Sequence, residues 1–277
     1  MEACDAVLIV GEDITHTAPR MALSLRQTVR QEARRLADEA RIPFWQDAAV
    51  RELAQQAKSP LYILHPCSTD LDDISAAVHH GKPSELTVLV SAIASLLEGP
   101  RLSEQDNSTL SETQKTLVKT IAGDLRAAKR PLLITGTSLQ DEALALAMST
   151  LVEALHQARE STVDCHFILA ENNSQGLSIL SADTPEKDLQ SALNRIESGQ
   201  AKRLVILEND LYQRVDNTRL DQAFDKLEEI VVIDHSWHQT AAKADLILPA
   251  ASFAETEGTL VNSEGRAYPC GTCGERP

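Results

Sequence analysis

Short apolar runs and amphipathic stretches alternate along the chain. Seven runs are almost continuously apolar, which is typical of strands that are buried on both faces of a sheet. These runs are 6–10, 61–64, 131–134, 167–169, 204–207, 230–233 and 246–248. A strand followed by a helix, repeated in this way, predicts an α/β fold in which mostly parallel sheets carry helices on both faces.

Helix signals fill the segments between these runs. Apolar residues recur at three- and four-residue steps over 25–40, 86–97, 117–125, 144–155 and 189–196. Ser111 and Gln114 have the spacing of a capping box, in which two side chains satisfy backbone amides at the start of a helix. The spacing of apolar residues predicts a further helix over 71–80, with His79 and His80 near its end.

The length of the chain predicts two domains, because 277 residues exceed one ordinary core and fit two domains of roughly 100 to 200 residues each. The chain changes character after the helix that ends near Ala158, which predicts a boundary near residue 160. The expected domains are a Rossmann-like α/β domain over 1–160 and a second, partial α/β domain over 161–277. Residues 268–277 are expected to form a disordered tail.

Composition and charge exclude several classes of partner. The chain is 43% hydrophobic but only 3% aromatic, so its cores are built from aliphatic residues, as in parallel α/β sheets. The formal net charge of -15 at pH 7 repels phosphate backbones, so no nucleic-acid partner is expected. No apolar run approaches the roughly 20 residues that span a bilayer, so no direct membrane contact is expected.

The cysteines argue against a metal site. Cys4, Cys67, Cys165, Cys270 and Cys273 are scattered and odd in number, and no charged-then-apolar leader precedes them, which points to a reducing cytoplasm. Cys270 and Cys273 have the spacing of half a zinc or iron–sulfur site, but no second pair completes it. We expect no metal site, and the sequence leaves the role of this pair open.

Polar residues follow most of the apolar runs, and ligands of open parallel sheets bind at the carboxyl ends of strands. The residues at these positions are 11–13, 65–67, 136–138, 171–173, 208–210 and 234–235, with Thr240 close behind. They can present amides and hydroxyls to a nucleotide, and they equally suit the capping of a following helix. His235 and His238 suit either a pocket or packing. A glycine-rich phosphate loop is absent after Val10 and after Ile134, which disfavours an ordinary dinucleotide or ATP site.

Several of these segments follow the order found in one known superfamily. They are 11–19, 128–136, 172–176, 204–210, 232–234 and the stretch "ADLILPAASFAETEGTLVNSEGRA" at 244–267. Together they resemble the molybdopterin oxidoreductases, which include formate dehydrogenases and nitrate reductases. The stretch at 244–267 is the most specific, and it is similar to the large iron–sulfur subunits of bacterial NADH:quinone oxidoreductase, respiratory complex I. The resemblance covers residues 5 to 267.

The resemblance implies a fold and a set of former cofactor contacts. The fold would be like that of formate dehydrogenase and DMSO reductase, with two doubly wound, Rossmann-like domains. In members that bind a pterin dinucleotide, the corresponding turns hold the nucleotide arms. Carried over to this sequence, the vestigial cofactor-binding positions are Gly11, Gly136, Asn209, Asp234 and Thr240.

Two of these turns depart from the pattern of the cofactor-binding members. The first reads Gly-Glu-Asp-Ile in place of Gly-x-Asn-Pro, and the later turn has Leu207 in place of the glycine in Gly-Glu-Asp-Pro. A side chain at Leu207 obstructs the approach of backbone to a pyrophosphate, and the adjacent acidic groups repel that anion. We therefore expect no cofactor in this chain, and we predict no catalytic residue and no metal ligand.

The resemblance to complex I implies that this part of the protein catalyses no reaction and has a structural role. The chain would be an internal fragment of the large iron–sulfur subunit, a molybdoenzyme-like scaffold in the peripheral arm, on the cytoplasmic side of the cell membrane. Its expected partners are the other subunits of that arm and the parent's own cluster-bearing domain, whose iron–sulfur clusters lie upstream. The whole complex would pass electrons from NADH through the clusters to quinone, and whether this chain has any activity stays open.

Two alternatives remain at this stage. The chain could be a fragment of a true molybdopterin-dependent enzyme such as a formate dehydrogenase, or a generic nucleotide-binding α/β module, which rests on fold analogy alone. In the leading interpretation, Leu246–Leu248 is a short buried strand that Pro249 ends. The segment after it is then inherited packing and not a working site.

Overall fold

The computed structural model describes residues 1–99, 108–159, 163–169, 171–184, 187–252 and 254–271. Its contacts divide the chain into two compact units, Met1–Glu171 and Asn172–Pro277. The boundary thus lies later than the predicted position near residue 160, because β5 (Asp164–Ile168) pairs with β4 (Pro131–Gly136) of the first unit.

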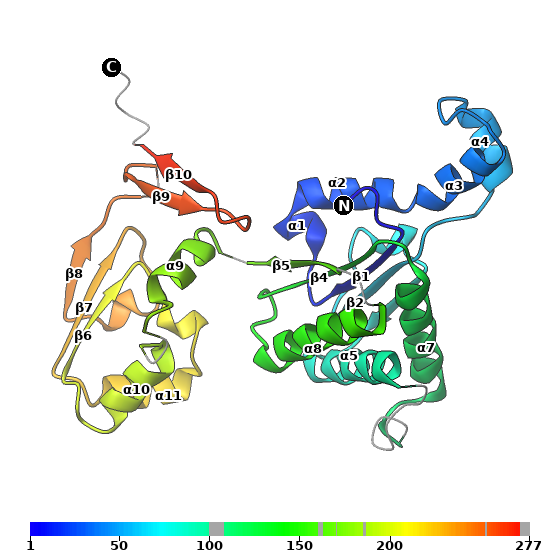
Figure 1. The fold of residues 1–277 in the computed structure, drawn as a ribbon. Helices are drawn as coiled ribbons and strands as arrows, with labels where there is room; N and C mark the ends of the chain where they lie inside the picture. Colours follow the sequence, from blue (N-terminus) through cyan, green and yellow to red (C-terminus); the bar gives the residue numbers. More distant parts are fainter. Residues whose placement is uncertain (100–107, 160–162, 170, 185–186, 253, 272–277) are drawn as a thin grey trace. The chain divides into compact units, whose positions relative to one another are not determined.

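The first unit is built on a parallel five-stranded sheet in the order β3-β2-β1-β4-β5 (Figure 1). The remaining strands are β1 (Ala6–Val10), β2 (Leu61–His65) and β3 (Ala77–His80). All five residues of β1 are buried, as expected for a central strand covered on both faces. The predicted α/β class, with a parallel sheet flanked by helices, is confirmed.

Helices cover both faces of this sheet. Val7 and Ile9 of β1 share a core with α1 (Ile14–Thr17) and α2 (Pro19–Thr28). Leu8 and Val10 point to the opposite core, which is made with α5 (Pro83–Glu98), α7 (Glu112–Ala127) and α8 (Glu142–Arg159). The predicted capping box starts α7. The backbone amide of Gln114 donates to Ser111 Oγ at 3.3 Å, and the backbone amide of Ser111 donates to Gln114 Oε1 at 2.9 Å.

The helix predicted over 25–40 is interrupted in the structure. It ends at Thr28 and resumes as α3 (Gln31–Glu39), which packs against α4 (Asp47–Ala54). Ser59 explains the break, because its amide donates to the Val29 carbonyl at 2.9 Å and its hydroxyl accepts from the Glu32 amide at 3.0 Å. A residue far along the chain therefore satisfies backbone groups at the break, and the local spacing could not show this.

The helix predicted over 71–80 is wrong. Only a short 3₁₀ turn, η1 (Asp72–Ile74), forms, and β3 follows it with His79 opposite Leu64 of β2. The apolar spacing that suggested a helix rested on few residues, and pairing with the edge of β2 satisfies the backbone better than an isolated helical turn.

The second unit carries a parallel three-stranded sheet in the order β6-β7-β8. Its elements are β6 (Arg203–Leu207), η2 (Leu211–Gln213), β7 (Glu229–Asp234), η3 (Ala241–Lys243) and β8 (Leu246–Pro249), with helices α9 (Ser174–Ser181), α10 (Leu189–Glu197) and α11 (Asn217–Phe224). Ile206 and Val232 pack with Leu193 of α10 and Leu220 of α11, which places the core on one face of the sheet.

The other face of this second sheet is open among the described residues. Val205 and Leu207 of β6 are 64% and 66% exposed, and Leu246 and Leu248 of β8 are 48% and 43% exposed. Val205 and Leu246 lie on either side of Val231 in register, so these side chains form one apolar surface. The strands of this sheet were predicted to be buried on both faces, and this prediction is wrong. The prediction of a buried strand at 246–248 is wrong for the same reason.

A hairpin follows the second sheet. β9 (Gly258–Val261) pairs antiparallel with β10 (Ala267–Cys270), and the chain turns through Asn262 and Gly265. Gly265 has a φ of 78°, a backbone conformation that favours glycine. The predicted disordered tail over 268–277 is thus wrong for 268–270, which are in β10, and residues 272–277 lie outside the described part of the chain.

Candidate functional site

The predicted site residues divide between the two units. Gly11 and Gly136 lie at the ends of the adjacent strands β1 and β4 in the first unit. Asn209, Asp234 and Thr240 lie at the carboxyl ends of β6 and β7 and in the loop behind them in the second unit. The structure therefore places two of these residues in the first unit and three in the second.

The two glycines of the first unit are packed closely by the chain itself. Gly11 has a φ of 72°, and a Cβ there would lie 3.0 Å from Leu144 Cδ2. A Cβ on Gly136 would lie 2.2 Å from the Ile168 carbonyl oxygen and 2.3 Å from Glu12 Oε1. The missing side chain of Gly136 is thus needed for the approach of Glu12 and of the β5 backbone.

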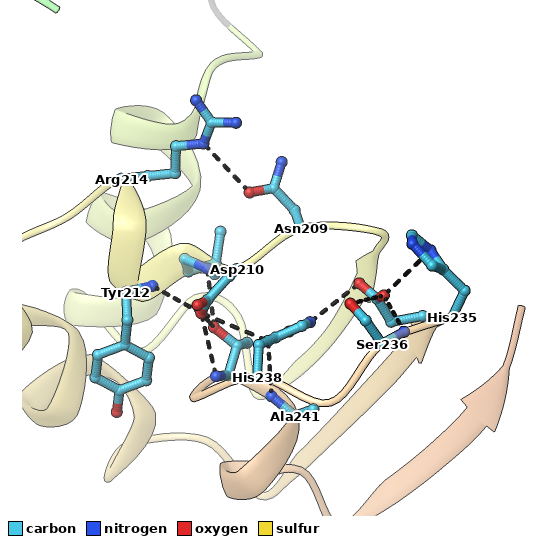
Figure 2. A network of polar contacts seen from close by, with 11 residues as sticks. Asn209, Asp210, Tyr212, Arg214, His235, Ser236, His238 and Ala241 are labelled. Atoms are coloured by element: carbon cyan, nitrogen blue, oxygen red, sulfur yellow. Dashed lines mark hydrogen bonds and ion pairs between the residues drawn. The ribbon is translucent and has the colours of Figure 1, made fainter. Parts of the chain in front are cut away.

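In the second unit, Asp210 lies at the centre of a polar network (Figure 2). The Thr240 hydroxyl donates to Asp210 Oδ1 at 2.6 Å and accepts from the Leu211 amide at 2.8 Å. The amides of Thr240 and Tyr212 also donate to Asp210 Oδ1, at 3.2 and 3.3 Å. Thr240 is completely buried, so these bonds fasten the turn after β6 to the loop after β7.

Asp234 and His238 extend the same network. His238 Nε2 lies 3.0 Å from Asp234 Oδ2, and His238 Nδ1 accepts from the Ala241 amide at 3.2 Å (Figure 2). Because a backbone amide can only donate, Nδ1 is the acceptor and Nε2 carries the proton that Asp234 accepts. Asp234 Oδ1 accepts from the Ser236 amide at 2.8 Å and from its hydroxyl at 3.2 Å.

Asn209 stands apart from the buried network. It accepts from Arg214 Nε at 3.4 Å near the surface, while the preceding Glu208 adopts a φ of 46°. Leu207 points outward from the end of β6 and is exposed. The Asn209 side chain therefore makes a local contact only, whereas the Glu208 amide donates to the Ile233 carbonyl of β7 at 2.8 Å and the neighbouring Asp210 belongs to the network.

Hydrogen bonding keeps the partly buried Asp210 and the buried Asp234 ionised. Burial opposes ionisation of Asp210, but bonds from the hydroxyl and amide of Thr240 outweigh it and lower the pKa of Asp210. The pKa of Asp234 is also lowered, because bonds from Ser236 and His238 outweigh the effect of its burial. Two carboxylates held in the charged form are suited to fixing loops, since a general acid or base needs a pKa closer to neutrality.

This network contains a histidine and aspartates, as many catalytic sites do, but these side chains are already hydrogen-bonded within the protein. Both ring nitrogens of His238 already have partners, so the ring is not available to take a proton from a substrate. Across the described ranges of the chain, no group of three or more histidine, cysteine or acidic side chains is arranged to hold a metal ion. Cys4 is buried, which raises the pKa of its thiol, and Cys273 lies outside the described residues.

The sequence predicted the strand ends but not which of their residues form the main hydrogen bonds. Glu12, Ser138 and Asp210 were within the polar segments that follow the apolar runs, yet nothing distinguished them from their neighbours. His238 was open to either a pocket or packing, and the structure shows it packed into the network. The available signal was a carboxylate two or three residues after a strand, at Glu12 and at Asp210, where an acceptor can satisfy loop amides.

The fold and these strand ends define an α/β protein built on parallel sheets with polar networks at their carboxyl ends. The chain belongs to the molybdopterin oxidoreductase family, whose model matches residues 1–269. The predicted resemblance is confirmed.

The curated relatives are G subunits of NADH-quinone oxidoreductases. The one from Pseudomonas fluorescens is 41% identical over 269 residues, the one from Shewanella oneidensis is 42% identical over 267 residues, and the one from Escherichia coli O6:H1 is 36% identical over 267 residues. Each match covers 96% of this chain but only 28–29% of the relative, so the chain corresponds to part of that subunit. These relatives do not favour the two alternatives, a fragment of a formate dehydrogenase or a generic nucleotide-binding module.

Solved structures with a similar fold include an enzyme complex. The formyltransferase/hydrolase complex FhcABCD from Methylorubrum extorquens, in complex with methylofuran, matches with a TM-score of 0.56 and 16% identity. The match covers 98% of this chain and 69% of that chain. At this identity it supports the fold alone. No helix in the described ranges is long and apolar enough to cross a membrane.

Proposed function

We propose that this chain is a non-catalytic, molybdoenzyme-like scaffold of an NADH-quinone oxidoreductase. The observation that carries the proposal is the match to G subunits of that complex over 96% of the chain at 36–42% identity. In the proposal, electron transfer from NADH to quinone is the work of the whole complex. This chain contributes a folded surface on which the cluster-bearing part of the same subunit packs.

The strand ends support a role without a pterin dinucleotide. In the first unit, Glu12 fills the space beside Gly136, where the backbone of a cofactor-binding protein would approach a ligand. In the second unit, Leu207 replaces the glycine of the cofactor-binding turn, and Asp210 is committed to Thr240. A phosphate at either position would have to displace a side chain that already holds the loop, so these residues do not fit the cofactor of the family.

The proposed partners and location follow from the same relatives. The partners would be other subunits of the peripheral arm, together with the cluster-bearing domain of the same large subunit. The arm would lie on the cytoplasmic side of the cell membrane, at its inner face, and the chain would contact no lipid itself. The open apolar face of the second sheet is consistent with a protein that functions within a larger assembly.

A chimera tests this proposal. The corresponding region of the Escherichia coli G subunit is replaced by this chain, and NADH:quinone activity is measured in membranes. We expect an assembled, active complex from the chimera. We expect loss of assembly when the region is deleted, and also when the chimera carries Leu8→Asp, which places a charge in the core of the first sheet. A complex that assembles and works equally well without the region would contradict a scaffold role.

A further inference from the structure

The end of β1 lies at a position where an open sheet usually binds an anion. β1 and β4 are parallel neighbours, and the helix that follows β1 packs on the opposite face from the helix that follows β4. Strand connections that leave to opposite faces open a crevice at the carboxyl ends of the two strands. Gly11 and Glu12 enter this crevice from β1, and Gly136 and Ser138 enter it from β4.

A carboxylate of the chain itself occupies this crevice. Glu12 is 1% exposed, although it lies two residues after the end of β1 in a chain of net charge -15. Its Oε1 accepts from the Ser138 amide at 2.9 Å, and its Oε2 accepts from the Ser138 hydroxyl at 2.7 Å. A backbone amide and a hydroxyl that converge on two oxygens of one acidic group are the donors that proteins offer to a phosphate or a carboxylate.

The surrounding backbone is shaped for this side chain. Gly11, with its positive φ, turns the chain so that Glu12 points inward, and Leu139 and Leu144 close over Gly11. On the other side, a Cβ on Gly136 would lie 2.3 Å from Glu12 Oε1. The position of Glu12 thus requires Gly136, while Gly11 is required by its positive φ and by the packing of Leu139 and Leu144.

We propose that Glu12 is an internal ligand, which fills the anion-binding position between β1 and β4 and excludes external anions from it. The donors on Ser138 form a site for a small oxyanion, such as a carboxylate or a phosphate group, and the chain supplies that anion from its own sequence. Removal of the Glu12 carboxylate therefore creates a vacant site that a free anion can enter. The inference stands on the geometry of the first unit, and it is independent of any role in a larger complex.

Chemical rescue by small anions tests the proposal on the whole chain. The melting temperature of the protein is measured in sodium chloride, formate, acetate and phosphate at equal ionic strength, for the wild type, Glu12→Ala, Glu12→Gln and Glu52→Ala. Glu52 is an exposed acid of α4 and serves as the matched control. In chloride, Glu12→Ala should lose roughly 5 °C, because the Ser138 amide and hydroxyl lose their acceptor and the buried space of the Glu12 side chain is left empty.

Formate should restore a large part of this loss in Glu12→Ala, with a saturable dependence on concentration. Acetate and phosphate measure how large an anion the site accepts. The wild type, Glu12→Gln and Glu52→Ala should show only the common effect of salt. An equal response of Glu12→Ala and Glu52→Ala to formate would overturn the proposal, as would a saturable response of the wild type.

A second measurement covers the case in which Glu12→Ala does not fold in chloride. Soluble protein is then recovered after refolding in formate and in chloride. Recovery in formate alone supports the proposal. Failure in both, while Glu12→Gln folds normally, would show that the volume of the side chain and not its charge is required, and the proposal would be wrong. Neither readout uses the complex, so this result and that of the chimera are distinguishable.

Discussion

Thr240 is the residue on which the network of the second unit depends most. Its hydroxyl joins the Asp210 carboxylate to the Leu211 amide and is completely buried. Replacement of Thr240 by Val keeps the shape but leaves the Leu211 amide without its acceptor. We expect a loss of about 1–3 kcal/mol in local stability. Hydrogen–deuterium exchange of peptides over 203–249 should become faster by the corresponding factor.

The matched control for this substitution is Thr240→Ser. Serine keeps the hydroxyl and removes only a methyl group, so exchange over 203–249 should stay close to that of the wild type. If Thr240→Val leaves exchange unchanged while Thr240→Ser speeds it, the hydrogen bonds do not fasten the loop and packing of the methyl group explains its stability.

The two aspartates of the same network predict a dependence of stability on pH. The folded protein lowers the pKa of Asp210 and of Asp234 below the ordinary value of about 3.9 for aspartate. A depressed folded pKa stabilises the protein fully above the unfolded value, and this contribution is lost as pH falls through the folded value. The second unit should therefore keep this contribution down to about pH 5 and lose it below about pH 4.

Exchange over 203–249, corrected for the intrinsic effect of pH, measures this dependence. The double variant Asp210→Asn, Asp234→Asn should be less stable than the wild type at pH 7, and the difference should shrink below about pH 4. A difference that stays constant from pH 7 to pH 3 would show that these carboxylates do not contribute through ionisation.

At this scale, the sequence could indicate the right segments but not their partners. The segments 11–13 and 136–138 were predicted as strand ends, yet the bond between Glu12 and Ser138 joins residues that are 126 positions apart. A carboxylate next to a strand is equally compatible with an exposed turn. Only the pairing of β1 with β4 brings the two side chains together.

Among the secondary-structure elements, the seven apolar runs all proved to be strands, because a continuous apolar run is a strong local signal. β3, β9 and β10 were missed for a physical reason. β3 is a four-residue edge strand that contains two histidines, and β9 and β10 are largely exposed and contain glycine and proline. Strands of this kind are specified by the backbone to which they pair and not by their own apolar content.

The second sheet yields a prediction about solubility. Val205 and Leu207 lie on its open face, whereas Ile206 between them lies in the core. The double substitution Val205→Thr, Leu207→Thr should reduce self-association and leave folding stability nearly unchanged, since threonine favours strands and both positions are exposed. Light scattering at increasing protein concentration measures the effect.

Ile206→Thr is the control on the same strand. It buries a hydroxyl and removes apolar volume from the core, so it should destabilise the second unit by about 1–3 kcal/mol without reducing self-association. If both variants change light scattering to the same degree, the open face is not the surface through which the chain associates.

For the whole molecule, the fold is the one expected from the family. The residues at the strand ends, however, do not suit the pterin cofactor of that family. The first unit has a parallel sheet with helices on both faces, and the second unit has a smaller sheet with one open face. Apolar side chains are exposed on the open face of that sheet, and Leu177, Ile179 and Leu180 are exposed on α9. Exposed apolar side chains of this kind are expected of the scaffold proposed above, because partners in an assembly would cover them.

The central claim, that this scaffold carries no pterin cofactor, is tested most directly by pterin analysis. The protein is produced in cells that make molybdopterin, purified, and oxidised in acid, and the fluorescent pterin product is measured per mole of protein, with a molybdenum determination beside it. We expect background fluorescence and no molybdenum. A pterin or molybdenum content that is stoichiometric with the protein would contradict the claim.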